Sequence, residues 1–219
     1  MSKFILLDKD KAKKAVETLE KTYPNQKYYL NFSNPLELLV AAILSAQTRD
    51  VVVNSITPAL FKKYKTAKDY SSANESELLK YVSKVTFAGN KAKNIITACS
   101  ILDNKYSGKV PNKMEELVAL PGVGRKTANT ILINAYGIIE GIPVDTWVIK
   151  ISSRLGLTEN KKPDDIEKDL MGLVEKNHWK NIAYVFKAHG HEICRSTAPL
   201  CSKCVLKEIC PKNGVSKSE

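Results

Sequence analysis

Lys126 directly follows a glycine turn, residues 120–125, in which Pro121 ends one helical stretch and Gly122 and Gly124 permit a tight corner. Apolar residues recur at helical spacing on both sides, so we expect two helices, the second of which opens with Lys126. The positive end of a helix dipole disfavours a protonated amine. A neutral amine is a nucleophile that can form an imine with an aldehyde carbon. The alternatives are an ordinary solvated lysine and a phosphate contact.

The glycine turn itself has the features of an anion site. Its backbone N–H groups, with those of the following first helical turn, point outward and can hold a phosphate oxygen. A tight helical corner without a ligand would use the same residues, and the Gly-x-Gly pattern alone does not separate the two.

Asp145 lies nineteen residues beyond Lys126, between Pro143 and an apolar run that begins at Trp147. This context predicts that Asp145 is the N-cap of a helix. An ionised carboxylate held there could also stabilise a developing cation or take a proton from the lysine. Capping alone is the simpler role.

Four of the five cysteines are close together, with the spacing C-x6-C-x2-C-x5-C. Such clusters in a chain without a secretory signal indicate a metal site rather than disulfides. Four thiolates suit a [4Fe–4S] cluster, and zinc remains possible because it also accepts four thiolates, usually from paired C-x2-C knuckles. The fifth cysteine, Cys99, falls on an apolar helical stripe and is expected in the core. The candidate ligands are Cys194, Cys201, Cys204 and Cys210.

The composition favours a polyanionic partner. The 219 residues carry 34 Lys and Arg against 23 Asp and Glu, a net charge of +11. Lysines greatly outnumber arginines, which suits phosphate contacts better than the reading of base edges. No apolar segment is long enough for a signal core or a bilayer span, so we expect a cytoplasmic, nucleoid-associated protein with no membrane partner.

Helical periodicity runs through nearly every long segment, and no alternation typical of strands is present. The fold class is therefore predicted to be all-α. Residues 213–219 show no pattern and are expected to form a frayed tail. The predicted apolar stripes include Ala12, Ala15, Val16 and Leu19; Leu36, Leu39, Val40, Ile43 and Leu44; Ile95, Cys99 and Leu102; Leu170, Leu173 and Val174; and Ile182, Val185, Phe186 and His189.

Taken together, these motifs resemble the endonuclease III family of helix–hairpin–helix DNA glycosylases. The resemblance extends from the first predicted helix to the last cluster cysteine. It is carried by residues 120–129, residues 144–146, the cysteine spacing, and the shorter matches at 31–39, 44–47, 90–95 and 189–190.

The resemblance implies two helical lobes flanking a DNA-binding cleft. A six-helix barrel lobe that includes the helix–hairpin–helix motif would span residues 28–138. Residues 1–27 and 139–219 would form a discontinuous second lobe with the [4Fe–4S] cluster. The implied activity is base excision with β-elimination at the abasic site, acting on oxidised pyrimidines that are flipped out of double-stranded DNA. We expect a monomer.

The resemblance also assigns roles to residues. Lys126 would attack the sugar C1′, and Asp145 would stabilise the oxocarbenium-like state. Gln47 would fill the gap left by the flipped base, with Phe87 as a second wedge. The hairpin residues that would bind the DNA backbone are Gly122, Val123, Gly124 and Arg125.

The chain departs from the family pattern beside the predicted catalytic aspartate. Trp147 stands where the family usually has histidine, and Lys150 where it commonly has arginine. These differences leave the range of lesions open. Two other functions are kept as alternatives: a monofunctional mismatch thymine or uracil glycosylase, which Lys126 argues against, and a non-catalytic DNA-binding module held together by zinc.

Overall fold

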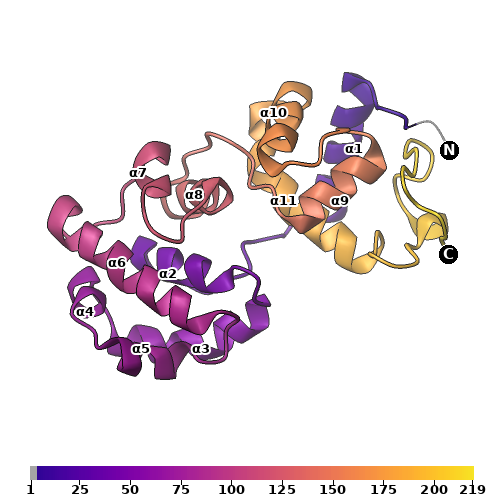
Figure 1. Ribbon diagram of the computed structural model, residues 1–219. Helices are drawn as coiled ribbons and strands as arrows, with labels where there is room; N and C mark the ends of the chain where they lie inside the picture. The colour runs from indigo at the N-terminus through magenta and orange to yellow at the C-terminus, as the bar shows by residue number, and fades with distance from the viewer. Residues whose placement is uncertain (1–3) are drawn as a thin grey trace. The chain divides into compact units, whose positions relative to one another are not determined.

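The computed structural model describes residues 4–219. They form helices joined by turns and loops, with no strand among them (Figure 1). The predicted all-α fold class is thus confirmed. None of the helices in this part of the chain combines the length and apolar character that crossing a lipid bilayer requires.

The chain divides into two compact units. Unit 1 comprises the residues up to Tyr28 together with Ile139–Glu219, and unit 2 comprises Tyr29–Ile138. The helices of unit 2 are α2 (Pro35–Ser45), α3 (Asp50–Lys63), α4 (Ala67–Ser71), α5 (Glu75–Val82), α6 (Ala88–Tyr106), α7 (Met114–Val118), α8 (Arg125–Ile131) and the π-helical turn η1 (Leu132–Tyr136). Those of unit 1 are α1 (Lys9–Thr22), α9 (Thr146–Leu155), α10 (Pro163–Leu173), α11 (Lys176–Glu192) and the 3₁₀ turn η2 (Cys201–Lys203).

Helix α2 is the central element of unit 2. Every residue from Leu38 to Leu44 is buried, and the helix packs against α3, α6 and α8. A helix that is apolar on all sides must be enclosed by others. Asn34 caps the start of α2 by accepting a hydrogen bond from the Glu37 backbone N–H (2.9 Å).

Helices α7 and α8 form the predicted hairpin. The turn between them is closed by a hydrogen bond from Val123 N–H to the Leu120 carbonyl (3.1 Å). Helix α8 begins at Arg125, one residue earlier than predicted, because Gly124 has extended backbone angles and is the N-cap. Lys126 is consequently the second residue of the helix.

The core of unit 1 is built on α1, α9, α10 and α11. The apolar stripe predicted for α1 is buried, and it belongs to one cluster with the buried side chains of α9 and α11. Trp147 of α9 lies directly on Gly190 of α11. A Cβ on that glycine would approach the indole ring to 2.1 Å, so only glycine fits there.

The expectation of a frayed tail from residue 213 is wrong. Asn213 is buried, and its side-chain amide donates to the carbonyls of Ile5 (2.8 Å) and Ser153 (3.3 Å). The Glu219 backbone bonds to Pro199 and Ser202. This segment is held by polar bonds to the backbone, which leave no apolar periodicity in the sequence.

Candidate functional site

The hairpin in unit 2 is seated on two neighbouring helices. Gly122 has a φ of +81°, and a Cβ there would come within 3.1 Å of the Asn94 amide nitrogen in α6 and 3.3 Å of the Ile43 side chain in α2. Gly124 differs, because a Cβ there would meet no atom within 4 Å. The hairpin is therefore packed closely on one side and open at Gly124.

Lys126 is half-buried in the first turn of α8. Its backbone carbonyl accepts a hydrogen bond from the Thr130 hydroxyl (2.9 Å). Arg125 beside it is exposed, whereas the Val123 side chain is buried. Val123 can thus offer only its backbone to a ligand.

Asp145 caps α9 in unit 1, as predicted. One carboxylate oxygen, Oδ1, accepts hydrogen bonds from the backbone N–H groups of Trp147 (2.8 Å) and Val148 (2.9 Å). Both bonds converge on that oxygen, so the two oxygens of the carboxylate have different environments.

The residues that depart from the family pattern form a small cluster after Asp145. The Trp147 ring lies 4.7 Å from the His191 ring, and the Lys150 ammonium lies 4.5 Å from the centre of the indole. The same ammonium donates to the Ser196 hydroxyl. This arrangement combines an aromatic contact with a cation–π contact.

Gln47 and Phe87 occupy two loops of unit 2. Both have left-handed backbone angles, with φ of +53° and +55°, which is uncommon for residues other than glycine. Phe87 is 62% exposed although it is a large apolar side chain. A hydrogen bond from Thr86 N–H to the Thr48 hydroxyl (3.1 Å) joins the loops.

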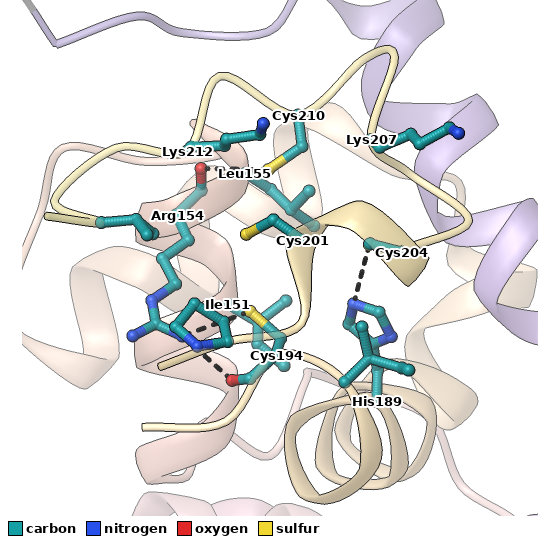
Figure 2. A pocket seen from close by; sticks show the side chains of 13 residues that line it. Ile151, Arg154, Leu155, His189, Cys194, Cys201, Cys204, Lys207, Cys210 and Lys212 are labelled. Atoms are coloured by element: carbon teal, nitrogen blue, oxygen red, sulfur yellow. Dashed lines mark hydrogen bonds between the residues drawn. The ribbon is translucent and has the colours of Figure 1, made fainter. Parts of the chain in front are cut away.

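The four clustered cysteines line one cavity of unit 1. Figure 2 shows their side chains arranged around it, on the loops that follow α11 and on η2. Within the described residues, no three His, Cys, Asp or Glu side chains converge as the ligands of one metal ion would.

Two further residues of this cavity were not identified as site residues from the sequence. The Arg154 guanidinium of α9 donates to the carbonyls of Cys194 (3.0 Å), Arg195 (2.7 Å) and Ser196 (3.0 Å). His189 of α11 lies 3.6 Å from the Cys204 sulfur through its Nε2 atom (Figure 2). Spacing along the chain gave no signal for Arg154, which lies forty residues before the first cysteine.

Burial affects the ionisation of the cavity side chains. It raises the pKa of the Cys210 thiol to about 11 and also raises that of Cys204. It lowers the pKa of His189 to about 4, so this imidazole is neutral at pH 7. A buried thiol becomes a thiolate when a metal centre compensates its charge. The four-thiol donor set therefore fits a metal centre.

The chain is similar over most of its length to known DNA repair proteins. Residues 40–176 match the HhH-GPD superfamily of base excision DNA repair proteins. Endonuclease III of Synechocystis sp. is 43% identical to this chain, and the alignment covers 93% of each of the two proteins. Endonuclease III of Bacillus subtilis is 40% identical, and the alignment covers 86% of each protein. The protein chain in the solved structure of a trapped endonuclease III–DNA covalent intermediate is 36% identical in sequence to this chain. The two superpose with a TM-score of 0.90, which covers 94% of this chain and 97% of that one. The chain belongs to the endonuclease III family within the HhH-GPD superfamily of base excision DNA repair proteins.

Proposed function

We propose that this protein is a DNA glycosylase with abasic-site lyase activity, which removes oxidised pyrimidines from double-stranded DNA. The observation that carries the proposal is the position of Lys126, half-buried in the first turn of a helix and directly after a glycine hairpin. A covalently trapped DNA complex of a relative 36% identical to this chain supports a nucleophilic residue.

Lys126 would act through its neutral amine. The Nζ lone pair attacks C1′ of the damaged nucleotide, and the glycosidic bond breaks with its electrons leaving on the base. One Nζ proton neutralises the departing base. The C1′–O4′ bond then breaks, and O4′ takes the second Nζ proton as the imine between Nζ and C1′ forms. Removal of a C2′ proton from this imine breaks the C3′–O bond, so that the strand is cut on the 3′ side.

Asp145 would stabilise positive charge on the sugar and assist proton transfer. Its Oδ1 atom already accepts two backbone hydrogen bonds, so Oδ2 is the atom assigned to this task. The backbone of the hairpin around Gly124 would hold a phosphate, because no protein atom would obstruct even an added Cβ there. Gln47 and Phe87 would enter the duplex from their exposed loops.

The four cysteines would hold a [4Fe–4S] cluster. Their side chains line one cavity, and ligation by four cysteines suits such a cluster. When bound, such a cluster can cross-link residues 194–210, a segment with few apolar residues of its own. We assign it a structural role, and we propose that the protein acts as a monomer on nucleoid DNA.

Borohydride trapping tests the nucleophile. Reduction of the imine should join the wild-type protein to a duplex that contains thymine glycol, giving a band of higher mass on a denaturing gel. Lys126→Gln should give no such band and should lower strand cleavage at least about 1000-fold while DNA binding persists. Lys80→Gln, which removes one exposed lysine from the same unit, is the matched control and should be trapped normally.

The substrate is tested with a panel of duplexes. These carry thymine glycol, dihydrouracil, uracil opposite guanine, 8-oxoguanine or an abasic site, and both base release and strand cleavage are measured. We expect oxidised pyrimidines to be released and cut together. Release of mismatched thymine or uracil without cleavage would replace the proposal with a monofunctional glycosylase.

A further inference from the structure

Lys91, in the first turn of α6, is a buried lysine that the proposed reaction does not use. It is 5% exposed, whereas lysine is almost never buried without partners. Its Nζ donates hydrogen bonds to the carbonyls of Leu44 (2.7 Å) and Ala46 (2.5 Å) and to the Thr48 hydroxyl (2.9 Å). An ammonium has three N–H donors, so this group is fully satisfied.

Two of these partners, the carbonyls of Leu44 and Ala46, lie at the end of α2, and Thr48 is in the loop that follows. The last carbonyls of a helix have no partner within the helix and form the negative end of its dipole. No basic residue lies in the last turn of α2 itself. Lys91 therefore supplies, from another helix, the cation that this helix end needs.

The same ammonium connects two loops. The Thr48 hydroxyl that accepts from Lys91 also accepts from the Thr86 backbone N–H (3.1 Å). Gln47 lies one residue before Thr48, and Phe87 one residue after Thr86. Both neighbours have the left-handed backbone angles described above, a conformation that persists only where the surroundings enforce it.

We propose that Lys91 is a positioning residue that holds the Gln47 and Phe87 loops together, in the conformation that enters duplex DNA. The inference rests on the proposed function, because it takes these two loops as the ones that probe the duplex. Loops that are already ordered lose less conformational entropy when they insert. Burial lowers the pKa of Lys91 to about 8, so at pH 7 most molecules still carry all three donors.

Lys91→Met tests the role, because methionine keeps most of the stem and removes the three donors. We expect kcat/KM on duplex thymine glycol to fall about 10- to 100-fold. Cleavage of an abasic site in single-stranded DNA should change less than about threefold, because no duplex has to be opened. Lys93→Met, an exposed lysine two residues away on the same helix, removes the same charge and should retain duplex activity.

A second readout follows insertion directly. The fluorescence of 2-aminopurine placed opposite the lesion should rise with wild-type protein, as the base loses its stacking, and should rise more slowly with Lys91→Met. Thr48→Val, which removes the shared acceptor, should reproduce this defect, and Thr48→Ser, which keeps the hydroxyl, should not.

Normal duplex activity of Lys91→Met, or an equal loss on single-stranded and duplex DNA, would overturn the positioning role. Failure of the proposed function has a different signature. In that case wild-type protein would not be trapped on DNA, whatever residue stands at position 91.

Discussion

Gly122 and Gly124 are separated by one residue in the hairpin, but only Gly122 is required by the fold. At Gly122 the backbone has a φ of +81° and the neighbouring atoms of Asn94 and Ile43 leave little room. At Gly124 the backbone angles suit any residue and the space is open. The first glycine is needed by the folded protein, and the second is free to serve a ligand.

Alanine substitution should distinguish the two glycines. Gly122→Ala should lower the free energy of unfolding by about 2 kcal/mol, because alanine is strained at positive φ and the contacts are tight. Gly124→Ala should leave it unchanged within about 0.5 kcal/mol and weaken DNA binding about tenfold, since a methyl group would keep a phosphate at a distance. Chemical denaturation and fluorescence anisotropy measure the two quantities. Unchanged DNA affinity in Gly124→Ala would contradict the phosphate site.

Among the helices, the start of α9 combines a structural and a proposed chemical task in one residue. Asp145 caps the helix through Oδ1, and asparagine can cap in the same way without a charge. Asp145→Asn should thus change stability by less than about 0.5 kcal/mol, whereas Asp145→Ala should lower it by about 1 kcal/mol.

The rate of base release should not follow stability in Asp145→Asn and Asp145→Ala. Both variants should lose about 100-fold or more in base release, because each lacks the negative charge. Thermal unfolding and single-turnover kinetics on the same preparations provide the comparison. Full activity in Asp145→Asn would show that only the cap matters.

Apolar patterns were sufficient to predict most helices. Val16, Leu39 and Phe186 each lie on a stripe that the structure buries, and Cys99 lies in the core as expected. Patterns could not predict interactions made by single polar groups. Lysine and arginine are surface residues by type, so the sequence did not indicate that Lys91 caps α2 or that Arg154 holds the loop after α11. The polar tail from residue 213 was missed for the same reason.

At the scale of the whole molecule, the net charge of +11 predicts a strong salt dependence. Neutralised phosphates release counterions, so the logarithm of the binding constant should fall linearly with the logarithm of salt concentration, by about 0.9 for each phosphate contacted. For undamaged duplex we expect a slope of about −3 or steeper. Fluorescence anisotropy over roughly 50 to 300 mM salt measures it. A flat response would contradict binding through the DNA backbone.

The two units should respond separately to loss of the proposed cluster. Cys201→Ala should abolish visible absorption and increase hydrogen exchange in residues 194–219, while peptides of unit 2 keep their protection, because the cavity belongs to unit 1. Cys99→Ala is the matched control. It lies in the core of unit 2, so it should keep the visible absorption and destabilise that unit by about 1 kcal/mol. Full protection of residues 194–219 in Cys201→Ala would refute the structural role.

Unit 1 joins two segments that are far apart in the sequence, as the bonds between Ile5 and Asn213 illustrate, and this sets the order in which a newly made chain can fold. Unit 2 is continuous in sequence, so its hydrophobic core can assemble soon after residue 138 has left the ribosome. The first helix of unit 1 has already emerged by then, but its partners α10 and α11 are translated later. The apolar face of α1 is therefore the surface that nascent-chain chaperones would have to shield until α11 has been translated.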